Sequence, residues 1–170
     1  MNNLQNYKWQ LNDKEIIRNI FTHTIYTYLS TFIEHGFTNG KLCFENILLY
    51  NNDENYKDIE YKIYTYIIQI PIKKFIIRII NFEKSKLNYD FNELYKDIIN
   101  FLSNISEHDV FNKIFNIKTL SLLNNNCNNL LEKYNKEIIK NKELSIKYAI
   151  LLLDVITNDK NHNDSLIKFL

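Results

Sequence analysis

The fold of this chain is decided by the stretch from Asn12 to Gly36, which reads NDKEIIRNIFTHTIYTYLSTFIEHG. Asn12 and Glu15 have the spacing of a capping box, in which two side chains satisfy free backbone N–H groups at a helix start. Gly36 supplies the left-handed residue at which helices commonly end. The segment Thr22–Tyr28 is rich in β-branched and aromatic residues and could form a strand by itself. The end signals nevertheless predict a helix over residues 12–35.

The hydrophobic period changes from helical to alternating after the turn at Asn39-Gly40. Alternation of apolar and polar residues is typical of strands. We expect three antiparallel strands near residues 41–50, 58–70 and 74–83. Pro71 should lie at a strand end or a bulge, because it has no N–H to donate to a neighbouring strand.

The pattern is helical from Asp90 onward, and we expect about four helices over residues 90–170. Asp90 and Ser106 are predicted to cap two of them. The run Asn124–Asn129, with five Asn in six positions, is interpreted as a loop or helix junction. No linker interrupts the chain. Residues 1–170 are therefore predicted to form a single α+β domain with an N-terminal helix, a three-stranded antiparallel sheet and a C-terminal helical bundle.

Two segments are predicted to lie deepest in the core. The third strand is apolar on both faces, so we expect it to be the most buried strand, with Ile77 and Ile79 inside. The segment Ile146–Ile156 is apolar nearly all round, which is typical of a helix enclosed by others. Ile150 and Leu153 are its predicted core residues.

The composition indicates an A/T-rich genome, because Ile and Asn occur 27 times each while Ala and Pro occur once each. This bias makes motifs that contain glycine, proline or arginine rare, so the absence of such motifs says little about function. The charges balance, with 21 basic and 20 acidic residues. Neither half of the chain forms an extended basic footprint for nucleic acid or an anionic membrane.

Cysteine usage and hydropathy predict a cytoplasmic, soluble protein. Cys43 and Cys127 are too few for a disulfide framework and are expected to be free, buried thiols in a reducing compartment. Met1–Asn12 has no apolar signal segment. The apolar stretches Ile63–Phe82 and Ala149–Ile156 contain charged residues, so we expect no transmembrane segment.

Catalytic and metal-binding motifs are not visible in the sequence. The string KLCFENILL at Lys41–Leu49 resembles part of a protein-kinase catalytic loop, but the catalytic Asp and the other kinase motifs are missing. The four His and two Cys residues lack the spacing of a metal site. We therefore expect no cofactor and no metal. An enzyme without recognisable motifs ranks third, behind the two binding functions that follow.

One strand face carries the candidate binding residues. Alternation along the second strand predicts that Lys62, Tyr64 and Tyr66 share one side. Ile59, Tyr61 and Ile63 are expected on the other side. Exposed aromatic residues are typical anchors for a protein partner, so the sequence favours a non-enzymatic interaction, assembly or inhibitor-type module. Nucleic-acid binding through the same Lys/Tyr face is the alternative function. The competing interpretation of the face is that its tyrosines only pack in the core or at a sheet edge.

Overall fold

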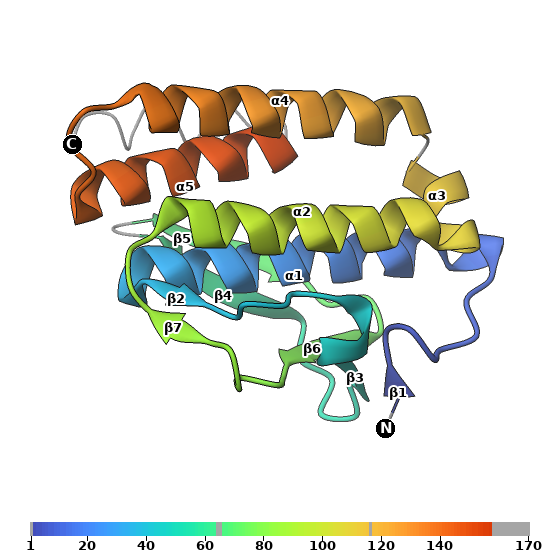
Figure 1. The fold of residues 1–170 in the computed structure, drawn as a ribbon. Helices are drawn as coiled ribbons and strands as arrows, with labels where there is room; N and C mark the ends of the chain where they lie inside the picture. Colours follow the sequence, from blue (N-terminus) through green and yellow to red (C-terminus); the bar gives the residue numbers. More distant parts are fainter. Residues whose placement is uncertain (1, 64–65, 116, 158–170) are drawn as a thin grey trace.

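The computed structural model describes residues 2–63, 66–115 and 117–157, which form a mixed α+β fold around one long helix (Figure 1). The described α helices are α1 (Lys14–His35), α2 (Phe91–Glu107), α3 (Asp109–Phe115), α4 (Ile117–Lys136) and α5 (Lys142–Thr157). The strands are β1 (Asn2–Asn3), β2 (Phe37–Thr38), β3 (Ile47–Asn51), β4 (Asp58–Ile63), β5 (Tyr66–Pro71), β6 (Phe75–Ile79) and β7 (Lys86–Leu87). Short 3-10 turns cover Leu11–Asp13 and Phe44–Asn46.

The predicted N-terminal helix is confirmed as α1, but its start signal lies elsewhere. The backbone N–H of Gln10 donates to the Asp13 carboxylate at 2.9 Å, so the capping box spans Gln10 and Asp13 and starts the 3-10 turn that leads into α1. The N-cap residue of α1 itself is Asp13, and not the predicted Asn12. The end is as predicted. Gly36 adopts a left-handed φ of 68°, and its N–H donates to the Phe32 carbonyl at 2.7 Å.

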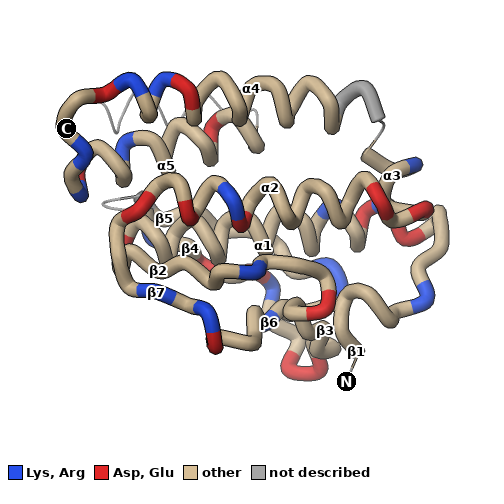
Figure 2. Tube along the Cα trace, in the orientation of Figure 1, with Lys and Arg blue, Asp and Glu red and all other residues tan. Residues whose placement is uncertain are grey.

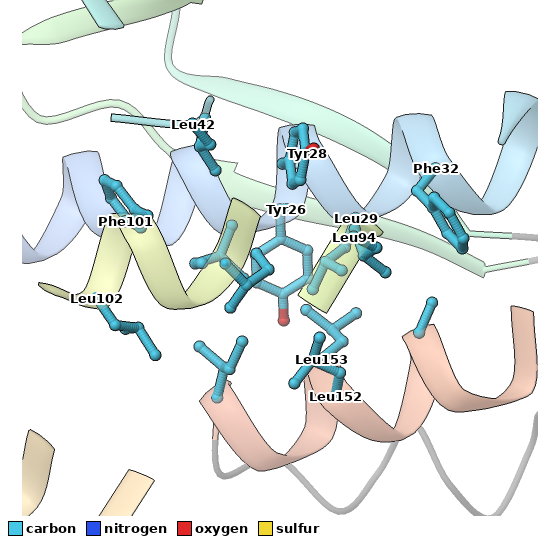
Figure 3. Packing of buried hydrophobic residues seen from close by; sticks show 14 of the residues in the cluster. Tyr26, Tyr28, Leu29, Phe32, Leu42, Leu94, Phe101, Leu102, Leu152 and Leu153 are labelled. Carbon is cyan, nitrogen blue, oxygen red and sulfur yellow. The ribbon is translucent and has the colours of Figure 1, made fainter. Parts of the chain in front are cut away.

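Helix α1 is buried on several sides, because strands and helices both pack against it. It contacts β4 and β6 on one side and α5 on another. Figure 3 shows the Tyr26 ring directed toward Leu152 and Leu153 of α5, whereas Tyr28 lies near Leu42 on a different side of the helix. Tyr26 and Tyr28 are both buried. The buried apolar side chains of the strands and the helices form one cluster around this helix.

The three-stranded antiparallel sheet has a different composition from the predicted one. Its order is β1-β3-β6, so the N-terminal residues Asn2–Asn3 supply the strand that the sequence did not reveal. The predicted strand near 41–50 begins only at Ile47, because residues 44–46 form a 3-10 turn. The pair β2-β7 and the hairpin β4-β5 form two further small sheets.

The predicted strand near 58–70 is two strands, β4 and β5, paired in antiparallel register. The prediction of one strand failed because Tyr64 and Thr65, which separate them, are not the Asn, Asp or Gly that mark a tight hairpin. Pro71 is the last residue of β5, as expected for a residue that cannot donate a hydrogen bond.

The strand β6 is not the most buried strand, which corrects the prediction for residues 74–83. It lies at the edge of its sheet, and only one of its faces packs on α1. Phe75 and Ile77 are buried, whereas Ile79 is only half-buried. The Arg78 guanidinium lies 4.6 Å from the centre of the Tyr50 ring on the outer face.

Asp90 caps α2 as predicted, since its carboxylate accepts the backbone N–H of Asn92 at 2.9 Å. The predicted cap at Ser106 is wrong, because Ser106 lies inside α2. The buried helix predicted for Ile146–Ile156 is confirmed as part of α5, where Ile150 and Leu153 are in the core. Residues 158–170 of the predicted helical region lie outside the described residues.

The Asn-rich segment is helical, which corrects the predicted loop at Asn124–Asn129. It lies in the middle of α4. The reason is a stripe of buried residues on one face of that helix, formed by Leu120, Cys127, Leu130 and Tyr134. Their spacing is that of a helix packed against a core, and such packing outweighs the weak helix propensity of Asn.

Candidate functional site

The face predicted to bind a partner belongs to the β4-β5 hairpin. Lys62 is exposed, and its Cα pairs with that of Ile67, which is 63% exposed. Tyr64 lies outside the described residues, and so does the side chain of Tyr66. The Cα of Tyr66 pairs with that of Ile63, so the run of alternation that joined Lys62 to Tyr66 is divided between two strands.

The other face of β4 points inward, as the alternation predicted. Tyr61 is buried, and its hydroxyl lies 2.7 Å from Nδ1 of His23 on α1. Nε2 of His23 lies 3.2 Å from the Pro71 carbonyl, which can only accept a hydrogen bond. Nε2 therefore carries the proton, and Nδ1 accepts the Tyr61 hydroxyl proton. Burial lowers the pKa of His23, although the bond to Pro71 opposes this, so the neutral ring is favoured.

A second exposed surface lies at the small β2-β7 sheet. Phe82 is 54% exposed and Leu87 is 78% exposed. The ring of Phe37 packs edge-on against Phe82, with 5.6 Å between the ring centres. Leu87 pairs directly with Phe37 across the two strands, so these two residues lie on one face. We call Phe37, Phe82 and Leu87 the β2-β7 patch.

A buried carboxylate holds the segment that follows β2. Asp97 on α2 is 1% exposed, and it accepts the hydroxyl proton of Tyr28. It also accepts backbone N–H groups from Asn39 at 3.0 Å and Gly40 at 2.8 Å, with a longer contact of 3.3 Å from Leu42. Hydrogen bonds to a charged acceptor are stronger than those between neutral groups. The carboxylate therefore fixes the backbone next to the patch.

The segment carrying Phe82 is pressed against this fixed backbone. Gly40 has a φ of 78°, and a Cβ atom there would lie 2.7 Å from the Lys84 carbonyl oxygen. Only glycine permits both this conformation and this approach. The Ser85 N–H and hydroxyl both donate to the Phe82 carbonyl, at 3.0 and 2.6 Å. The exposed Phe82 therefore lies at the start of a tight turn, and this turn packs against the backbone at Gly40.

Charged side chains surround the β2-β7 patch with both signs. Lys84 and Lys86 are exposed beside Glu83, and Figure 2 shows these charges along the segment leading into β7. The Lys86 amine lies 3.5 Å from the Glu93 carboxylate of α2. An apolar centre with a polar, charged rim is the usual anatomy of a protein-binding surface.

Sequence reasoning missed the β2-β7 patch. Phe82 and Leu87 lie five residues apart in a polar stretch, so they match neither the strand period nor the helix period. The one available signal was that two large apolar residues lack periodic partners. Their proximity to Phe37 depends on the pairing of β2 with β7, which brings together residues about fifty positions apart in the sequence.

His108 packs against aromatic rings, and the two cysteines are buried. The His108 ring lies against Phe44 and Phe111, with ring centres 5.9 and 4.9 Å apart. Cys43 and Cys127 are buried, unpaired thiols, and burial raises the pKa of Cys127 to about 12. Within residues 2–63, 66–115 and 117–157, no three His, Cys, Asp or Glu side chains are grouped so that they could hold a metal ion.

No protein-family model, curated protein or solved structure matches this chain. Among the described helices, none combines the length and the apolar character needed to cross a membrane.

Proposed function

We propose that this protein is a non-enzymatic interaction module that binds a protein partner through the β2-β7 patch. The observation that supports this proposal is the rigid support behind two exposed apolar side chains. Asp97 fixes the backbone beside Phe37, and the turn at Phe82–Ser85 is closed by hydrogen bonds. A surface ordered before binding loses little conformational entropy in the complex, which favours affinity.

The partner should present a concave apolar site with a polar rim. Phe82 and Leu87 protrude, so they act as anchors that enter such a site. Truncation of a central anchor typically weakens binding by about 2 kcal/mol or more. The mixed charges of Lys84, Lys86 and Glu83 would orient the complex more than they would strengthen it.

The compartment proposed for this module is the cytoplasm. Cys43 and Cys127 are both buried and unpaired, which suits a reducing environment. The hairpin residues Lys62, Tyr64 and Tyr66 remain the second candidate surface for the same function.

A comparative capture experiment tests the proposal. Tagged wild-type protein, a Phe82→Ser/Leu87→Ser variant and a Leu122→Ser control are used to capture proteins from the native source, and the bound proteins are quantified by mass spectrometry. Leu122 is a matched control because it is 62% exposed on α4, away from the patch. We expect specific partners to be retained by wild type and control and lost by the patch variant. The purified partner should then bind the patch variant at least about tenfold more weakly.

Equal capture by the patch variant would contradict the assignment of this surface. A Tyr64→Ala/Tyr66→Ala variant distinguishes the two surfaces, because loss of capture only there would move the binding site to the hairpin. Retention on nucleic-acid resin with a steep salt dependence would instead support the nucleic-acid alternative.

A further inference from the structure

The loop between α4 and α5 exposes two adjacent isoleucines. Ile138 is 97% exposed and Ile139 is 73% exposed. Among the large apolar residues that are exposed in the described part of the chain, no other two are adjacent in sequence. Large apolar residues scattered singly on a surface are ordinary, whereas a contiguous exposed group indicates an interaction site.

These isoleucines lie on a protruding tip of the molecule. Helices α4 and α5 pack against each other, and the loop joins them at one end of the helical layer (Figure 1). A side chain that is 97% exposed projects from the surface and does not line a groove. A matching cavity of a protein partner or the interface of a bilayer would bury such a tip, and the charge around the tip favours the bilayer.

Basic residues surround the tip. Residues 133–147 contain five lysines and two glutamates, although each half of the whole chain is balanced. Figure 2 shows lysine positions gathered at the end of α4 and the start of α5. Lys140 and Lys142 follow the isoleucines in the sequence and lie over aromatic rings, with 5.2 Å from the Lys140 amine to the Tyr134 ring and 4.4 Å from the Lys142 amine to the Tyr89 ring. These contacts hold the two lysine amines against tyrosine rings of α4 and of the segment before α2.

One of the two acidic residues is held by the protein itself. The Tyr148 hydroxyl of α5 donates to the Glu137 carboxylate at 3.2 Å. Because lysines outnumber glutamates five to two in residues 133–147, the exposed isoleucine pair lies in a segment with an excess of positive charge. Apolar insertion together with a basic cluster is the combination by which peripheral proteins bind anionic lipid.

We propose that the α4–α5 loop docks on the surface of an anionic phospholipid bilayer. Ile138 and Ile139 enter the interface between headgroups and acyl chains. Lys136, Lys140 and Lys142 bind the negatively charged headgroups. This activity is separate from the proposed protein-binding function, because it uses a different segment of the chain.

The test is sedimentation of the full chain with vesicles of phosphatidylcholine alone or of phosphatidylcholine and phosphatidylserine in equal parts. We expect binding to the serine-containing vesicles at low salt, weakening as salt is added, and little binding to phosphatidylcholine alone. Ile138→Asn/Ile139→Asn should lower the partition coefficient at least about tenfold, because the inserted apolar groups are lost. Lys140→Gln/Lys142→Gln should also lower it about tenfold or more, because each basic residue contributes roughly a factor of five near such a surface.

Matched variants control for exposure and for net charge. Leu122→Asn removes an equally large exposed apolar residue from α4, and Lys8→Gln/Lys57→Gln removes two exposed lysines elsewhere. Both should bind vesicles like wild type, and so should Phe82→Ser/Leu87→Ser. The proposal is overturned if wild type does not sediment with the anionic vesicles. It is equally overturned if the isoleucine variant, verified as folded by its melting transition, binds like wild type or no worse than Leu122→Asn.

Discussion

Tyr28 of α1 and Asp97 of α2 are joined by a hydrogen bond in the protein interior, with the tyrosine hydroxyl donating to the carboxylate. Burial and the negative charge of Asp97 raise the pKa of Tyr28 far above its usual range, so the hydroxyl keeps its proton. The backbone N–H of Asn39 donates to both the Tyr28 oxygen, at 2.8 Å, and the Asp97 carboxylate, at 3.0 Å. The pair thus ties two helices to the loop behind the β2-β7 patch.

Replacing the carboxylate should destabilise the protein strongly. Asp97→Ala leaves the buried Tyr28 hydroxyl and the Gly40 N–H without their acceptor, and we expect the free energy of unfolding to fall by about 3 kcal/mol or more. Urea unfolding measures the loss. Asp53→Ala is the control, because Asp53 is exposed and its replacement should change stability by less than about 0.5 kcal/mol. Equal urea midpoints for Asp97→Ala and wild type would show that the carboxylate does not hold this loop.

The buried His23 should make stability depend on pH. Its folded pKa lies below the ordinary value of 6.5, mainly because burial penalises the charged ring. The unfolded chain therefore binds more protons in the interval below pH 6.5, so the stabilising contribution is complete above 6.5 and is lost as the pH falls toward the folded pKa.

Urea unfolding over a pH series of wild type and His23→Gln tests this linkage. As the pH falls below 6.5, the free energy of unfolding should decrease less in the variant than in wild type. His35→Gln is the matched control, because His35 is an exposed residue of the same helix. Parallel pH profiles for wild type and His23→Gln would argue against a depressed pKa.

The Asn-rich part of α4 should be stabilised by better helix formers. Asn125, Asn126 and Asn129 are exposed within this helix. Alanine has a higher helix propensity by several tenths of a kcal/mol per residue, so the triple Asn→Ala variant should gain about 1–2 kcal/mol in unfolding free energy. Thermal unfolding measures the gain. If this segment were a loop, the substitutions would give no such gain. An unchanged or lowered thermal midpoint of the variant would therefore contradict the helix.

Two neighbouring inner positions of β6 should differ in their sensitivity to truncation. Ile77 is buried at 8% exposure, whereas Ile79 is half-buried near the strand end. Ile77→Ala should cost about 2–4 kcal/mol, because it removes buried methyl groups and leaves a cavity. Ile79→Ala should cost roughly half as much or less, because water already reaches part of its side chain. Similar urea midpoints for the two variants would contradict this order of burial.

Local signals in the sequence predicted the elements that depend on neighbouring residues. Gly36 marked the end of α1 because a left-handed residue must follow directly after the last turn. Asp90 marked the start of α2 for a similar reason, since a cap bonds to a backbone group two residues away. The inward face of β4, with Tyr61, followed from simple alternation.

Signals failed where local preference and tertiary packing disagree. Asn124–Asn129 looked like a loop, but the buried stripe at Cys127 and Leu130 keeps α4 helical through it. Residues 58–70 looked like one strand, because Tyr64 and Thr65, which separate β4 from β5, are not the Asn, Asp or Gly that mark a tight hairpin.

The sequence by itself determined the α+β class, the long N-terminal helix and the burial of α5, because these follow from periodicity and from groups a few residues apart. Only the tertiary structure decided which surfaces are available for binding. Phe37 and Leu87 meet because β2 pairs with β7, and Asp97 of a third element, α2, holds the backbone of Asn39 and Gly40 directly after β2. Contacts between distant segments depend on the packing of the whole core, and no local pattern of residues records them.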